Sequence, residues 1–201
     1  MKTYLPVSLA LFCMTAAPAL AEPLDPANIL QAVVGDWNSD GAEDLVLLTR
    51  GSEYMDLLFF LQDKDGAYLK PAGAAVGKVW GRMGADTFVG QEPDVKALPN
   101  GSIQVITRND SIGRDRWQQT LTLAYRNTDF VVAGLTYSYY DTLEPDNNGD
   151  CDVNVLTGKG IANKPDGKGG HIRLTIAAAP EFVTFQNWPD DSVSRICGIG
   201  G

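Results

Sequence analysis

The chain has 201 residues, with 25 acidic against 16 basic side chains and a formal net charge of −9 at pH 7. An acidic surface repels phosphate backbones and anionic headgroups, so this balance argues against a nucleic-acid-binding protein and against attachment to an anionic membrane. The length is sufficient to bury one sizeable core, which predicts a single domain.

Residues 1–21 have the three parts of a secretory signal peptide. An N-terminal lysine is followed by an apolar stretch at residues 5–17, and a small-x-small cleavage site ends at Ala21. The apolar stretch is too short to span a bilayer, and no later apolar run reaches the length of a transmembrane helix. We therefore expect a mature all-β domain at residues 22–201, exported to the bacterial periplasm or the extracellular space without a membrane anchor.

A cluster of oxygen-bearing side chains follows near the start of this domain. The predicted metal ligands are the side chains of Asp36, Asn38, Asp40 and Asp44 and the carbonyl of Ala42. Carboxylates crowded on one turn repel each other unless a hard cation neutralises them, and Ca²⁺ takes six to eight oxygen ligands. Gly41 permits the sharp turn that such a loop requires. An acidic turn without metal is the alternative, because Asn, Asp and Gly are also ordinary turn residues.

The stretch from Gly35 to Leu48 resembles the calcium loop of FG-GAP and VCBS-type repeats, which form the blades of integrin-α-like β-propellers. The pattern Asp-x-Asn-x-Asp-Gly-x-x-Asp precedes an apolar strand in those repeats, as it does here. The resemblance is local and implies a structural Ca²⁺ rather than a catalytic metal. An EF-hand does not fit, because its loop needs a carboxylate or similar ligand at position 12, where this chain has Leu47.

Patterns typical of strands dominate the first half of the domain. We expect strands at residues 29–34, 44–49, 55–62 and 67–71, with an Asp-Gly hairpin turn between the last two. Residues 71–101 are rich in Gly, Ala and Pro. They are predicted to form a long connection that holds one or two short strands.

A second series of strands is expected at residues 102–107, 117–125 and 130–140. It repeats the outline of the first series, and a third unit starts at Val153, with a later strand at residues 171–177. Repeated sheet units are typical of propeller-like folds, but three units are too few to close a propeller of four to eight blades. The prediction is therefore an all-β fold of antiparallel meanders, either propeller-blade-like or an open or sandwiched sheet.

Two cysteines remain after removal of the signal peptide, Cys151 and Cys197. In an oxidising compartment, two cysteines with no other partner predict a disulfide. Around Cys151, residues 146–152 hold alternating acidic and amide side chains. This segment is expected to be a polar loop beside the disulfide, and a second cation site is the alternative.

Catalytic motifs are scarce. His171 is the only histidine, and we expect it at a strand edge, where nothing in the sequence supplies the serine and acid of a nucleophilic triad. Paired carboxylates for glycoside hydrolysis depend on spatial pairing, so that alternative stays open.

Three aromatic residues form a candidate ligand face. Tyr137 and Tyr139 share one face of their predicted strand, and Trp117 lies on a neighbouring strand. Exposed aromatic rings stack on sugars, which favours a glycan ligand, whereas burial of these rings in the core is the alternative.

Two functions follow from these patterns. The favoured one is an exported, calcium-stabilised, non-enzymatic β-protein that binds a protein or a glycan. The alternative is a secreted, glycan-directed hydrolase in which paired carboxylates act as acid and base. Unpaired edge strands of an open sheet would also favour oligomerisation or pairing with a partner's strand.

Overall fold

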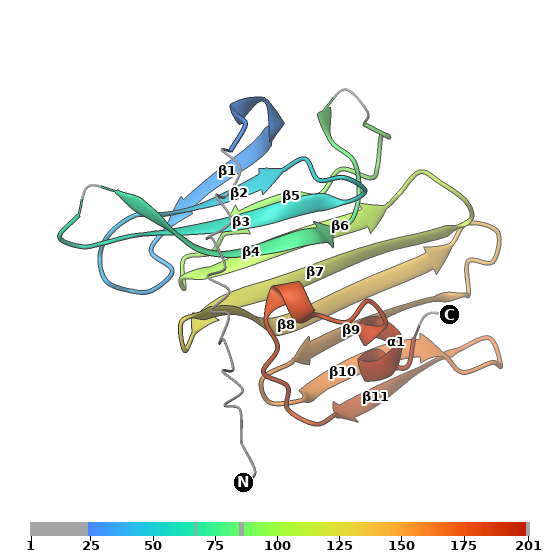
Figure 1. Cartoon of the computed structure of the whole chain (residues 1–201). Coiled ribbons are helices and arrows are strands. Elements are labelled where there is room, and N and C mark those ends of the chain that lie inside the picture. The colour runs from blue at the N-terminus through green and yellow to red at the C-terminus, as the bar shows by residue number, and fades with distance from the viewer. Residues whose placement is uncertain (1–23, 67, 85–86, 200–201) are drawn as a thin grey trace, which may run out of the picture.

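A computed structural model describes residues 24–66, 68–84 and 87–199, and the predicted signal peptide lies outside the described residues. The described chain folds into two antiparallel sheets that do not close into a barrel (Figure 1). This arrangement confirms the predicted all-β class and corresponds to the open, sandwiched alternative.

The first sheet contains four strands in chain order, preceded by the short 3-10 helix η1 (Pro26–Asn28). Its strands are β1 (Ile29–Gly35), β2 (Asp44–Thr49), β3 (Met55–Gln62) and β4 (Leu69–Val79). The first three match the predicted strands closely. The hairpin between β3 and β4 turns where Asp-Gly predicts it, with the N–H of Gly66 donating to the carbonyl of Asp63 at 2.9 Å.

Strand β4 differs from the prediction, because it continues through residues 72–79, which the sequence assigns to a connection. Its Gly and Ala residues lack β propensity, but small side chains allow β4 to pack beside the bulky residues of β3. Ala75 and Val79 are fully buried there. Pro71 is tolerated because β4 is an edge strand of its sheet.

The second sheet contains seven strands in chain order. They are β5 (Asp94–Ala97), β6 (Ser102–Asn109), β7 (Asp115–Arg126), β8 (Asp129–Asp141), β9 (Asn148–Asn154), β10 (Lys159–Pro165) and β11 (His171–Ala177). The predicted third unit is thus a continuation of this one meander. Strand β10 escaped prediction because its inward positions are Gly160 and Ala162, which carry no hydrophobic periodicity. Their small size fits them beside Val153 and Cys151 of β9.

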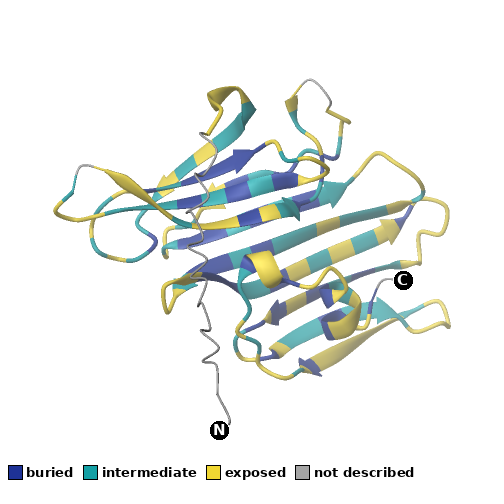
Figure 2. Cartoon of the chain, viewed as in Figure 1, coloured by how far each residue is buried: buried dark blue, intermediate teal, exposed yellow. Residues whose placement is uncertain are grey.

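The core lies between the inward faces of the two sheets. Phe59 of β3 stacks on Phe130 of β8, with 4.0 Å between ring centroids. Along β8 from Leu135 to Asp141, more buried and more exposed residues alternate, as one solvated face requires (Figure 2). The inward face of the second sheet therefore carries both the core and, further along the same strands, the aromatic residues discussed below.

A side-chain amide joins the two sheets where β1 approaches β5. The Gln31 amide donates to the carbonyl of Val95 at 2.9 Å and to the carboxylate of Asp94 at 3.0 Å. Its own oxygen accepts the N–H of Val95 at 3.0 Å. Gln31 therefore bonds to the exposed edge of β5 much as a neighbouring strand would.

The C-terminal segment crosses the inward face of the second sheet (Figure 1). It contains the 3-10 helix η3 (Phe185–Asn187) and the helix α1 (Ser192–Cys197). Thr184 forms a bridge with Val131 of β8, and the Gln186 side chain accepts the N–H of Val76 on β4 at 2.6 Å. The segment thereby covers the side of the sandwich opposite the contact between Gln31 and β5. The sequence did not predict η3 or α1.

Candidate functional site

The acidic loop between β1 and β2 forms a compact hydrogen-bonded turn. Asp36 accepts the N–H of Asp40 at 3.1 Å and of Gly41 at 3.0 Å, one at each carboxylate oxygen. Asn38 donates to Asp40 at 2.9 Å and accepts its N–H at 3.0 Å. Asp40 in turn accepts the N–H of Ala42 at 2.8 Å. Gly41 has a φ of 90°, consistent with the sharp turn expected there.

Asp44 lies apart from this turn and has a contact pattern of its own. Its side chain is fully buried, and its two oxygens accept the N–H of Trp37 at 2.8 Å and of Gln62 at 2.9 Å. It therefore ties the loop and the end of β3 to the first residue of β2.

The loop offers a hard cation the right kind of ligand atom but not a close group of carboxylates. Every side-chain donor is oxygen, and a carboxylate oxygen that accepts one N–H keeps a second lone pair for a metal. Asp36, Asn38 and Asp40 contact one another directly. However, no group of three or more His, Cys, Asp or Glu side chains among the described residues lies close enough together to hold a metal ion.

The predicted disulfide is confirmed, since Cys151 of β9 is bonded to Cys197 of α1. Both cysteines are buried. The bond fixes α1 to the inward face of the second sheet, beside the cleft described next.

The second acidic segment is only partly the loop that the sequence predicts, because β9 begins at Asn148. Asp150 accepts both hydrogen bonds from the Asn163 amide, at 3.0 and 2.8 Å, and Asp152 accepts the hydroxyl of Thr136 at 3.4 Å. These side chains lie along a strand, each with a separate partner. His171 is exposed at the start of β11, as expected, with its ring 3.2 Å from the carbonyl of Asn148.

The candidate ligand residues converge in a row on the inward face of the second sheet. Trp117 lies 6.3 Å from Tyr137, and Tyr137 lies 6.3 Å from Tyr139, between ring centroids. Trp80, which follows β4, extends the row with its ring 4.8 Å from Trp117. The β7–β8 register explains the row, because Trp117 pairs with Tyr139 and Gln119 pairs with Tyr137.

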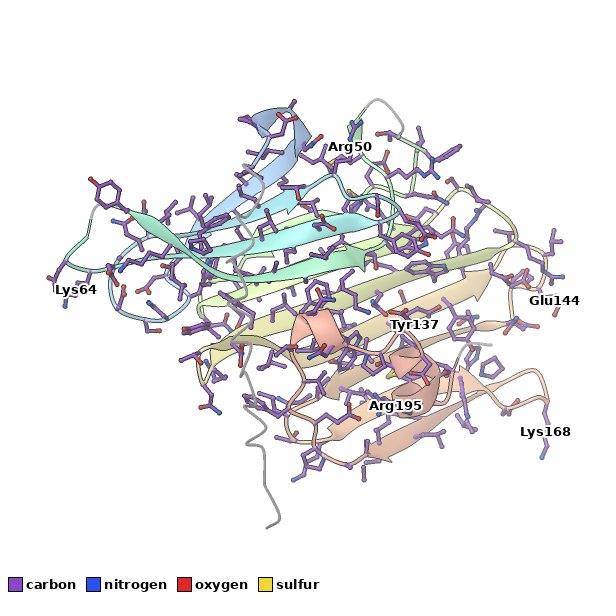
Figure 3. The ribbon with its side chains drawn as sticks, viewed as in Figure 1. Arg50, Lys64, Tyr137, Glu144, Lys168 and Arg195 are labelled. Carbon is purple, nitrogen blue, oxygen red and sulfur yellow. A yellow bond between two sulfur atoms is a disulfide. The ribbon has the colours of Figure 1, made fainter. Side chains whose placement is uncertain are left out.

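A cavity of about 420 Å³ lies over this row, between the second sheet, the end of β4 and the C-terminal segment. Figure 3 shows Tyr137 beside the C-terminal segment, which carries Arg195. The aromatic lining consists of Tyr54, Trp80, Trp117, Tyr137, Phe185 and Trp188. Three of the four tryptophans in the chain thus line one cavity, which we call the aromatic cleft. Tyr139 continues the row outside the lining.

Unpaired polar groups lie on the floor of the aromatic cleft. Thr107 and Gln119 both line it, and neither side chain hydrogen-bonds to another described residue. Thr107 is only 5% exposed, so its hydroxyl has few directions in which to find a partner other than into the cleft. Neither side chain is among the buried polar groups left without a partner, so both can bond to water or to a molecule held in the cleft.

Electrostatics keep the tyrosine hydroxyls of the row protonated. Burial raises the pKa of Tyr137, with the nearby Tyr139 and Asp115 adding to the effect, and burial also raises the pKa of Tyr139. Both hydroxyls are therefore hydrogen-bond donors at neutral pH.

Two carboxylates lie at the rim of the aromatic cleft. Asp190 is paired with Lys78 at 3.1 Å, and its side chain is 95% exposed. Asp191 is exposed beside it at the start of α1. Sequence reasoning did not single out this rim, nor Trp80, Phe185 and Trp188, because these residues come from segments that were predicted to be connections or were left unassigned.

No protein-family model matches the chain, and no curated protein or solved structure matches it either. Among the described residues, no helix has the length and apolar character needed to cross a membrane.

Proposed function

We propose that this protein is an exported binding module that holds a small glycan in the aromatic cleft. The observation that carries the proposal is the combination of aromatic walls with unpaired polar groups in one cavity. Sugar rings have apolar faces and polar edges, so they suit a sheet face on which Trp117 and Tyr137 lie beside Thr107 and Gln119. The volume of about 420 Å³ lies within the usual range of small-ligand pockets, roughly 300 to 1,000 Å³.

Binding is favoured over hydrolysis by the nature of the rim carboxylates. A glycosidase needs one carboxyl group shielded from water, so that it stays protonated and acts as an acid. Asp190 is almost fully exposed and paired with Lys78. A glycan-directed hydrolase that uses Asp190 and Asp191 remains the alternative function, and it predicts cleavage of a bound oligosaccharide.

Fluorescence titration tests the glycan proposal, because three of the four tryptophans line the cleft. The probes are cellobiose, maltose and N,N′-diacetylchitobiose, and product analysis of each mixture tests hydrolysis. We expect at least one probe to change the emission saturably, with affinity at least tenfold weaker in Trp117→Ala. Tyr68→Ala is the matched control, because Tyr68 is 78% exposed and lies outside the cleft.

The milder variants Tyr137→Phe and Thr107→Val keep the test valid if Trp117→Ala does not fold. Each removes one hydroxyl and leaves the shape of the cleft nearly unchanged. A protein that binds none of the probes, or that binds them equally well in all four variants, would contradict a glycan function for the cleft.

We further propose that the acidic loop binds a structural Ca²⁺ through Asp36, Asn38, Asp40 and the carbonyl of Ala42, with Asp44 at the ninth position. Support comes from the all-oxygen donor set and from the shared turn of Asp36, Asn38 and Asp40. Calorimetric titration of chelator-treated protein with Ca²⁺ should give binding heat and a rise in melting temperature that grows with calcium concentration. Both should be lost in Asp40→Ala, and no heat at millimolar Ca²⁺ would rule out the site.

Export is proposed from the pattern of residues 1–21 and is consistent with the buried disulfide, since such bonds persist in oxidising compartments. N-terminal sequencing of protein recovered from the periplasm or medium should begin at Glu22. Protein that retains Met1 and stays in the cytoplasm would contradict this proposal.

A further inference from the structure

Two arginines lie next to each other on the outward face of the second sheet. Arg108 of β6 pairs with Gln118 of β7, and Arg116 lies two residues before Gln118 on the same face. Diagonal neighbours of this kind have Cβ atoms about 7 to 8 Å apart, within reach of long side chains. Tyr140 of β8 pairs with Arg116 on its other side and is 49% exposed.

Each of these arginines has a buried nitrogen without a hydrogen-bond partner among the described residues, Nε of Arg108 and Nη1 of Arg116. An unpaired buried donor costs about 1 to 3 kcal/mol, and more when it is charged. Unsatisfied groups of this kind are uncommon in folded proteins. A bound acceptor on this face would explain both.

Two other arginines of this acidic chain do have carboxylate partners. Arg114 contacts Asp141 and Glu144, and Arg195 contacts Glu181. The shortage of partners at Arg108 and Arg116 is therefore not caused by a shortage of carboxylates.

Two acids face this pair without neutralising it. The Glu92 carboxylate accepts the N–H of Gly90 at 2.8 Å and makes no ion pair with Arg108. Backbone N–H groups lower the pKa of Glu92, and the charge of Arg108 adds a smaller effect in the same direction. Asp110 is exposed just after the end of β6. With these acids nearby and a net charge of −9 on the chain, a single compact anion fits the pair better than a polyanion.

We propose that Arg108 and Arg116 form a binding site for a tetrahedral oxyanion, phosphate or sulfate, either free or carried as an ester. Guanidinium groups donate two parallel hydrogen bonds to such anions, and two forks can contact one anion from adjacent strands. Gln118 and Tyr140 add neutral donors beside them. The site is separate from the aromatic cleft, because Arg116 and Trp117 are consecutive residues of β7 and their side chains point to opposite faces of the sheet.

The test follows the arginine Nε–Hε resonances by NMR during titration with inorganic phosphate and inorganic sulfate, with chloride at matched ionic strength as the reference. EDTA is present so that phosphate does not act through bound calcium. We expect saturable shifts of the Arg108 and Arg116 signals at millimolar anion, with little response of Arg173. This measurement needs no variant that might fail to fold.

Variants then test the assignment. Arg108→Gln and Arg116→Gln should each weaken anion binding at least tenfold. Arg173→Gln is the matched control, because it removes the same charge from the outward face of the same sheet at β11, opposite Asn163 of β10. Absence of shifts beyond those in chloride, or equal weakening in all three variants, would overturn the proposal.

A second arm distinguishes the two sources of the anion. Dextran sulfate is titrated at the same concentration of sulfate groups as the inorganic salt. Tighter binding of the polymer that still depends on Arg108 and Arg116 would identify an ester-borne group as the ligand. Binding of inorganic phosphate or sulfate without the polymer would identify the free ion.

Discussion

The clearest energetic prediction concerns Asp44, because its environment is fully determined by short contacts. Its carboxylate is completely buried and accepts two backbone N–H groups, from Trp37 at 2.8 Å and from Gln62 at 2.9 Å. Hydrogen bonds to a charged group contribute about 1.5 to 3 kcal/mol each. Asp44→Ala removes both and should lower the free energy of unfolding by about 3 to 6 kcal/mol.

The smaller change Asp44→Asn should cost less, because the amide keeps one acceptor oxygen while its NH₂ group faces the second N–H donor. We expect a loss of at least about 1.5 kcal/mol, corresponding to one charged hydrogen bond. For a domain of this size, each kcal/mol lowers the melting temperature by about 2 to 4 °C. Asp44→Ala should therefore melt at least about 6 °C below the parent protein.

The assay is urea unfolding followed by circular dichroism, with EDTA in every sample so that loss of bound calcium does not contribute. Glu43→Ala is the matched control, since Glu43 is the adjacent acid and is exposed. Its removal should change stability by no more than about 0.5 kcal/mol. If Asp44→Ala stays within about 1 kcal/mol of this control, the anchoring role of Asp44 is wrong.

Three further predictions concern pH, the disulfide and a close contact. Arg114 and backbone N–H groups lower the pKa of Asp141 from 3.8 to about 2, so its contribution to stability is present above pH 4 and is lost as the pH falls toward 2. The stability difference between the parent and Asp141→Asn should shrink over that range, and a constant difference would contradict it. Replacing Cys151 and Cys197 together by serine should lower the free energy of unfolding by about 2 to 5 kcal/mol in chemical denaturation, whereas an unchanged midpoint would show that α1 is held without the bond. Gly35→Ala would place its Cβ 2.3 Å from the Trp37 ring and should cost about 1 to 3 kcal/mol with a shift in tryptophan emission. Gly73→Ala is its control, because there the nearest atom is 3.7 Å away.

Local periodicity was sufficient to locate the strands that contain large or β-branched residues. Strands β3 and β11 have the predicted boundaries, because alternating or continuous apolar side chains mark them directly. Strands β4 and β10 were missed in whole or in part, since their Gly, Ala and Pro residues resemble a connection when read alone. Their strand conformation depends on pairing with β3 and β9, which only the folded chain supplies.

The same distinction applies to the candidate sites. Trp117, Tyr137 and Tyr139 were identifiable because alternation within a strand and pairing between adjacent strands place them on one face. Trp80 and Trp188 join them from segments far apart in the sequence, and no spacing rule indicates that convergence. The pair Arg108 and Arg116 was likewise invisible, because the register between β6 and β7 determines which arginines are neighbours.

The hydrogen bonds between Gln31 and β5 also affect the tendency of the protein to associate in concentrated solution. Open sheets expose strand edges that recruit other chains. Here β1 and β5 shield each other through Gln31, and the C-terminal segment accepts the N–H groups of Val76 on β4 and Val132 on β8. Strand β11 is left at the outer limit of its sheet, with six of seven residues exposed. Shelf life and recombinant yield should accordingly depend on Gln31, which lies outside the aromatic cleft, since its loss would uncover two further edges at once.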